Sequence, residues 1–160
     1  MNHIWSPWRM EYIESNKEEG CVFCSAQENE DGAQNLIAFR GKRAYVILNR
    51  YPYTSGHLMV VPFDHKPNLE ELDPLTRAEM MELTAQCMTV LRKVYHPQAF
   101  NMGANIGESA GAGVKAHVHI HIVPRWAGDT NFITILGETR VLPEALDRTY
   151  ERVKKAFLEG

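Results

Sequence analysis

The chain has 160 residues, a formal net charge of −3 at pH 7, 44% hydrophobic residues and 23% charged residues. This size predicts a single domain spanning residues 1–160, and the charge argues against nucleic acid as a partner, because proteins that bind duplexes carry a basic stripe. Since the sequence shows neither a signal-peptide pattern nor an apolar run of about 18 residues, we expect a cytoplasmic protein with no membrane partner.

The N-terminal part of the chain combines an aromatic arm with a cysteine motif. Residues 1–20 contain Trp5 and Trp8, and we expect this arm to pack on the domain. Cys21 and Cys24 then form a Cys-x-x-Cys motif, which in an intracellular chain is typical of a metal site or a redox pair. The third cysteine, Cys87, falls at an apolar position of a predicted helix, so we interpret it as a small buried hydrophobe.

Short apolar runs bounded by turn residues predict four strands. The first two cover residues 35–40 and 44–48 and form a hairpin around Gly41-Lys42. The third covers 57–62. The fourth covers 99–106, and a small-residue loop follows it.

Two helices complete the pattern. Asp73 followed by Pro74 is typical of a helix start, and this helix ends before Pro97. One apolar stripe at three- and four-residue steps runs along it: Met80, Leu83, Cys87, Leu91 and Val94. A second amphipathic helix is predicted from Pro143 to about residue 158. Strands, helix, strands and helix in this order favour an α+β fold, an antiparallel sheet with helices packed against it.

The most informative pattern is the alternation of His117, His119 and His121 with valine and isoleucine. On a strand, alternate side chains share a face, so the three imidazoles would form a row of about 13 Å. We expect this strand to lie centrally in the sheet. Three interpretations of the row are open: structural histidines, a catalytic metal site, or a nucleophilic imidazole oriented by its neighbours.

This histidine strand, ending in Pro124-Arg125, closely resembles the histidine-triad (HIT) family of nucleotide hydrolases and transferases. The upstream segment Gly56-His57-Leu58-Met59-Val60-Val61-Pro62 supports the resemblance, which covers about residues 21–135. The arm at Trp5-Ser6-Pro7-Trp8 and the segment 124–132 are similar to the branch with bacterial diadenosine tetraphosphate phosphorylases and ATP adenylyltransferases. The resemblance implies an antiparallel sheet with one long central helix and a C-terminal helix, and a catalytic core over about residues 35–135.

The resemblance also implies roles for individual residues. His119 would be the nucleophile that attacks the α-phosphorus, and His121 would donate to the phosphate or to the leaving oxygen. His57 matches a fourth family histidine near the phosphates, and Asn49 matches the family's ribose contact. The remaining predicted substrate-binding residues are the donors and glycines of a phosphate-binding loop and an indole: Asn105, Ser109, Gly111, Gly113 and Trp126.

In zinc-containing members of the family, the Cys-x-x-Cys motif pairs with two histidines, which here are His65 and His117. The resemblance therefore implies a structural zinc held by Cys21, Cys24, His65 and His117, with no coordination position left for water. The alternative is a pair of buried or redox cysteines unconnected to His65. No catalytic metal is predicted.

The expected substrate is an adenine nucleotide, preferably diadenosine tetraphosphate, which would be cleaved by water or by phosphate through a covalent nucleotidyl-histidine. The alternatives are an adenosine phosphoramidate hydrolase and a non-catalytic nucleotide-binding module. The family also implies a homodimer.

Overall fold

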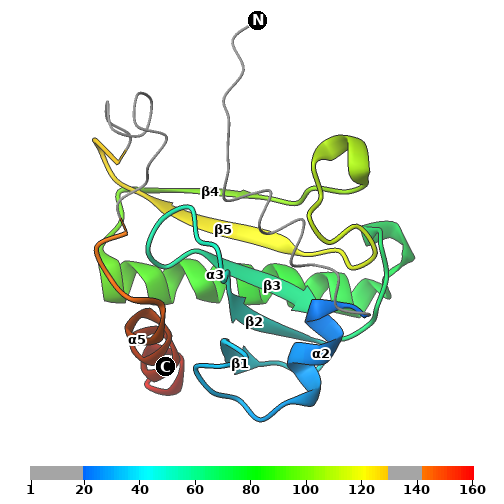
Figure 1. Ribbon diagram of the computed structural model, residues 1–160, viewed down its shortest axis with the longest axis horizontal. Helices are drawn as coiled ribbons and strands as arrows, with labels where there is room; N and C mark the ends of the chain where they lie inside the picture. The colour runs from blue at the N-terminus through cyan, green and yellow to red at the C-terminus, as the bar shows by residue number, and fades with distance from the viewer. Residues whose placement is uncertain (1–19, 130–141) are drawn as a thin grey trace, which may run out of the picture.

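The computed structural model describes residues 20–129 and 142–160, so nearly all of the predicted N-terminal arm and part of segment 124–132 lie outside the described residues. Within these residues, five antiparallel strands form one sheet in the order β1-β2-β3-β5-β4 (Figure 1). The strands are β1 (Ile37–Arg40), β2 (Ala44–Leu48), β3 (Leu58–Pro62), β4 (Ala99–Gly103) and β5 (Ile120–Arg125). The helices are α2 (Val22–Glu28), α3 (Pro74–Tyr95) and α5 (Leu146–Leu158), with 3-10 turns at Leu69–Glu71 and Glu108–Ala110. The predicted α+β class is confirmed.

The long helix α3 starts as the sequence predicts. The Asp73 side chain accepts a hydrogen bond from the Leu75 N–H at 2.8 Å, which caps the helix, and Pro74 occupies its first turn. Four of the five stripe residues are buried and Val94 is half-buried, so the predicted core face is confirmed. Cys87 is fully buried among them, as expected.

The two faces of the sheet have different roles. Helix α3 packs against β2, β3 and β5, while α5 packs against α3 and β1 (Figure 1). Directly paired residues of neighbouring strands point to the same face of the sheet. His121 pairs with Met59, and Met59 pairs with Ile47, so these three side chains share one face. The hydroxyl of Tyr45, also on this face, donates to the Phe23 carbonyl of α2 at 2.8 Å. Helix α2 therefore lies on the histidine side of the sheet.

The predicted histidine strand differs from the observed one. Strand β5 begins only at Ile120, and it lies between β3 and β4, so that β3 occupies the middle of the sheet. Residues before Ile120 leave the regular ladder because their partners lie beyond the end of β3: the Val118 N–H donates to the Lys66 carbonyl at 2.8 Å. His117 and His119 therefore precede the strand instead of belonging to it.

Three other boundaries also shift. Strand β4 ends at Gly103, and β1 begins at Ile37. Helix α5 begins at Leu146, because Ala145 takes its N-cap position. Helix α2 was not predicted, since seven residues around two cysteines carry no readable apolar stripe. Within the described residues, no helix is long and apolar enough to span a bilayer.

Candidate active site and metal centre

His119 is held with one ring nitrogen occupied and the other available. Its Nδ1 lies 2.9 Å from the His117 carbonyl oxygen. Because a carbonyl only accepts, Nδ1 carries the proton, and Nε2 keeps a lone pair. The side chain is only 5% exposed, and burial lowers its pKa, so the ring is neutral at pH 7. A neutral imidazole with a free Nε2 is the form that a nucleophilic histidine requires.

His121 takes its orientation from His57. The Tyr53 backbone N–H donates to His57 Nδ1 at 3.2 Å, which leaves the His57 proton on Nε2. That nitrogen lies 2.9 Å from His121 Nδ1 and donates to it, so the His121 proton is on Nε2. Burial, and to a lesser extent His119, lowers the pKa of His121 to about 4. His121 is therefore a neutral N–H donor beside His119, at 4.8 Å between ring centroids.

Asn49 lies beside His57 and His121. It is the residue that the family resemblance implies to contact ribose. Its amide nitrogen is 3.4 Å from His57 Nδ1, and its carbonyl oxygen accepts from the Tyr51 N–H at 2.9 Å. The side chain is half-buried at the end of β2. Asn49 is thus brought to the histidines.

The loop between β4 and β5 starts next to the histidines. The residue just before the loop is Gly103 at the end of β4, which pairs with His121 of β5. Gly107 and Gly111 have φ angles of 82° and 81°, a conformation that favours glycine. The predicted donors of this loop, Asn105 and Ser109, are exposed, and so is Gly113. The loop therefore offers exposed polar side chains on the segment that starts opposite His121.

Trp126 has a different location. It follows the end of β5, about 16 Å of extended chain beyond His121. Its indole N–H donates to the Tyr95 carbonyl at 3.4 Å, at the C-terminal end of α3. The preceding residue, Arg125, pairs with Asp129 and with Asn101. This segment connects β5 to α3 and β4, and the indole N–H is held at the end of α3.

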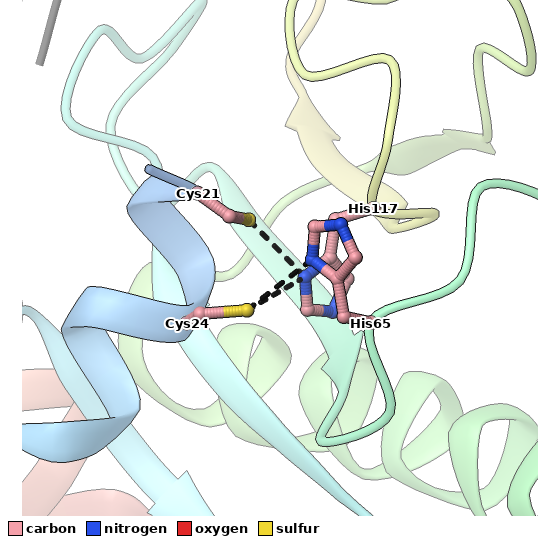
Figure 2. A group of neighbouring side chains, drawn as sticks. All are labelled: Cys21, Cys24, His65 and His117. Carbon is pink, nitrogen blue, oxygen red and sulfur yellow. Dashed lines mark hydrogen bonds between the residues drawn. The ribbon is translucent and has the colours of Figure 1, made fainter. Parts of the chain in front are cut away.

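The four residues implied to bind zinc converge (Figure 2). Their ligand atoms all lie within 4.8 Å of one another. Cys21 Sγ is 3.3 Å from His117 Nδ1, Cys24 Sγ is 3.3 Å from His65 Nδ1, and Cys24 Sγ is 3.7 Å from His117 Nδ1. A tetrahedral zinc with ordinary bond lengths separates sulfur and nitrogen ligands by about 3.6 Å. These four residues are therefore placed to bind a metal ion.

The protonation pattern at this cluster also suits a metal. His117 is fully buried, and its Nε2–H donates to the Pro62 carbonyl at 2.9 Å, which leaves the Nδ1 lone pair facing both sulfurs. Such a carbonyl partner is what metal-bound histidines usually have. Burial raises the pKa of Cys21, but the contact with His117 and backbone hydrogen bonds outweigh it and bring it to about 6. Cys21 therefore reaches the thiolate form, which binds zinc, at neutral pH, whereas burial and the neighbouring Cys21 raise the pKa of Cys24.

The cluster of cysteines and histidines lies next to His119. Phe23, between the two cysteines, is 4% exposed, and its ring centroid lies 5.5 Å from that of His117 and 4.8 Å from that of His119. Tyr53, whose ring lies 4.8 Å from that of His57, was missed altogether. Its signal was an aromatic residue in the short loop that joins two predicted site residues, Asn49 and His57.

Comparison with known proteins identifies the family. The HIT domain model matches residues 32–128. An AP-4-A phosphorylase of Mycobacterium tuberculosis is 40% identical over 158 residues, which cover 93% of this chain and 80% of that protein. The asymmetrical bis(5'-nucleosyl)-tetraphosphatase of Schizosaccharomyces pombe is 32% identical and covers 78% of this chain and 64% of its own length. A Zn-bound histidine triad family protein from Mycobacterium smegmatis superposes with a TM-score of 0.70 and 26% identity, covering 88% and 94% of the two chains. The chain belongs to the HIT domain family.

Proposed function

We propose that this chain is an enzyme that cleaves dinucleoside polyphosphates, preferably diadenosine tetraphosphate, through a covalent adenylyl-His119. The observation that carries the proposal is the hydrogen bond from His119 Nδ1 to the His117 carbonyl, which leaves Nε2 as the nucleophile. The Nε2 lone pair forms a bond to the α-phosphorus as the bond to the leaving phosphate oxygen breaks. Nδ1 keeps its proton, and the positive charge of the resulting ring is met by the carbonyl of His117.

His121 assists the departure of the leaving group. Its Nε2–H donates a hydrogen bond to the leaving oxygen, which departs with the electron pair of the broken bond. His121 stays neutral in this step. Phosphate, or water that releases its proton to the solvent, then forms a bond to the adenylyl phosphorus, and the electron pair of the phosphorus–nitrogen bond returns to His119.

The choice of substrate rests on the relatives and on the site. The names of the Mycobacterium tuberculosis and Schizosaccharomyces pombe proteins refer to dinucleoside tetraphosphates. Asn49 supports a nucleoside, since a half-buried amide beside His57 can meet ribose hydroxyls. We assign Asn105, Ser109, Gly111 and Gly113 to the phosphate chain. Trp126 belongs to the proposed substrate-binding set only through the family resemblance, since its indole is bonded to α3.

The assembly that we propose is a cytoplasmic homodimer of one domain over residues 1–160. Among residues 20–129 and 142–160, strand β4 is an edge of the sheet and four of its five residues are exposed, so its outer backbone groups are available to pair with a second copy. The metal that we assign to Cys21, Cys24, His65 and His117 is zinc, because two thiolates and two imidazoles are its typical structural ligands. Its part is to hold the start of α2 against His117.

Incubation of the pure protein with diadenosine tetraphosphate, with and without orthophosphate, tests the proposed function. With phosphate as the acceptor the products are ADP and ATP, and with water they are AMP and ATP. The variant His119→Ala is expected to lose at least about 10⁴-fold in kcat, because it lacks the nucleophile.

The same assay distinguishes the alternatives. Turnover of adenosine phosphoramidate but not of the tetraphosphate would identify a phosphoramidase. Tight nucleotide binding without turnover of either compound would identify a non-catalytic nucleotide-binding module. Full activity of His119→Ala would remove the covalent mechanism.

A further inference from the structure

Tyr53 contacts the pair formed by His57 and His121 in two ways. Its backbone N–H donates to His57 Nδ1 at 3.2 Å. Its ring lies 4.8 Å from the His57 ring and 6.4 Å from the His121 ring, and it is nearly parallel to the latter, with an interplanar angle of 23°. The residue stands in the loop between β2 and β3, and it is 36% exposed while His57 is 1% exposed. Tyr53 therefore lies between the histidine pair and solvent.

The backbone contact sets the direction of the whole hydrogen-bond chain. An amide N–H can only donate, so His57 Nδ1 must accept and His57 Nε2 must donate to His121. His121 is left with a proton on Nε2. The opposite arrangement would put the His121 proton on Nδ1 and leave its Nε2 without a proton to donate.

The ring contact protects this arrangement. The hydrogen bond between the two imidazoles is 2.9 Å long, and water that reached it would compete for both nitrogens. The Tyr53 ring, 4.8 Å from the His57 ring and stacked at 6.4 Å from the His121 ring, limits the access of water to one side of the bond and restricts the rotation of His121. The two contacts act in the same direction, since one fixes the tautomer and the other fixes the plane of the ring.

We propose that Tyr53 is a positioning residue that directs His121 Nε2–H toward the atom leaving the α-phosphorus. The inference rests on the proposed function, in which His119 forms the bond to phosphorus. The leaving atom accepts a hydrogen bond from His121, departs with its electron pair, and takes its proton from water afterwards. A more basic leaving atom gains more from this hydrogen bond, so the contribution of Tyr53 depends on the leaving group.

Two aryl esters of AMP measure that dependence. Phenolate is a basic leaving group and needs the donor, whereas 4-nitrophenolate is weakly basic and leaves with little help. Tyr53→Ala, which keeps the backbone N–H and removes the ring, is expected to lower kcat for the phenyl ester about ten-fold or more. We expect kcat for the 4-nitrophenyl ester to fall less than about three-fold, and KM to change little for both.

Two variants serve as controls. Tyr53→Phe keeps the ring and is expected to restore the activity on both esters to within about two-fold. Tyr51→Ala removes a tyrosine of similar exposure, 39%, from the same loop, and it is expected to leave the ratio of the two activities unchanged. Ring ¹⁵N NMR of His121 provides a readout that needs no substrate: Tyr53→Ala keeps the backbone N–H and therefore the Nε2–H tautomer, but it is expected to broaden the His121 ring signals, because the ring that restricts the rotation of His121 is gone.

The outcomes separate this inference from the proposed function. Equal losses on both esters, His121 ring signals in Tyr53→Ala as sharp as those of the parent protein, or the same selective loss in Tyr51→Ala would overturn the role of Tyr53. If His119→Ala still cleaves the 4-nitrophenyl ester, the proposed function fails instead. If Tyr53→Ala does not fold, Tyr53→Leu replaces it, because leucine fills the space without a planar face, and the same selective loss is expected.

Discussion

His119 and His121 owe their neutral state to burial, and this has a consequence for stability. The pKa of His121 is about 4 in the folded protein, below its ordinary value of 6.5. As the pH falls below about 6.5, the unfolded chain binds a proton that the folded protein does not bind, so the free energy of unfolding decreases until about pH 4. The expected loss from His121 alone is up to about 3 kcal/mol, at about 1.4 kcal/mol for each pH unit.

Urea unfolding between pH 7 and pH 4 measures this effect. The matched variant is His121→Gln, which removes the titrating group but keeps the four proposed metal ligands. Its free energy of unfolding is expected to fall less steeply with acid than that of the parent. Because any metal loss in acid affects both proteins alike, the difference between the two slopes isolates His121. Parallel curves would contradict the neutral, buried state.

Among individual residues, those that belong to a sequence motif could be predicted. Residues whose role depends on where the fold places their side chains could not. The alternating histidines and the Cys-x-x-Cys motif pointed to His117, Cys21 and Cys24, which do converge. Tyr53 has no motif, because its role depends on a loop that turns its ring over His57. The contact that Trp126 makes could not be predicted either, since its indole N–H donates to the Tyr95 carbonyl at the end of α3, which is distant in sequence.

At the scale of elements, Gly56 fixes the approach of the His57 loop to α3. Its φ is +80°, and a Cβ there would lie 2.9 Å from Leu91 Cδ2 and 3.2 Å from the Tyr95 ring. We expect Gly56→Ala to lower the free energy of unfolding by about 2–4 kcal/mol, since backbone strain and overpacking add. Gly128→Ala is the matched control, with the same φ and nothing within 4 Å of the new Cβ.

Thermal or urea unfolding of both variants tests this argument. The control is expected to lose only the strain contribution, about 1 kcal/mol. Equal losses in the two variants would show that the contact with α3 is unimportant. A chemical shift change at His57 in Gly56→Ala, absent in Gly128→Ala, would connect the contact to the active site.

Elements with strong local signals were the predictable ones. Helix α3 was placed almost to the residue because Asp73, Pro74 and Pro97 mark its ends. Strand β2 matched its predicted bounds. The start of β5 was missed because Val118 finds its backbone partner outside the ladder, which the alternation of side chains does not encode.

At the scale of the whole molecule, the proposed zinc joins three distant parts of the chain. The two cysteines lie at the start of α2, His65 lies in the segment after β3, and His117 lies just before β5. We expect one zinc per chain by elemental analysis after purification without chelators. Cys24→Ser is expected to lose the metal. It is also expected to lower the Tm by at least about 5 °C, because the zinc would no longer cross-link the three parts of the chain.

Cys87→Ala controls for the loss of a thiol, since Cys87 is buried in the core away from the cluster. It is expected to lower the Tm but to retain the zinc. Purified parent protein that contains no zinc would reject the assignment. Because the His117 carbonyl also holds His119, removal of the metal is further expected to disturb the ring ¹⁵N signals of His119.

Gly103 indicates where the site could be remodelled. It faces His121 across β4 and β5, and a Cβ at this position would meet nothing within 4 Å. Its side chain would project on the same face as the imidazole. A protein engineer could therefore add volume here without repacking the core. A series from alanine to leucine would fill the space beside the His121 imidazole stepwise, so that the bulk of one side chain could be varied next to the proposed leaving-group donor.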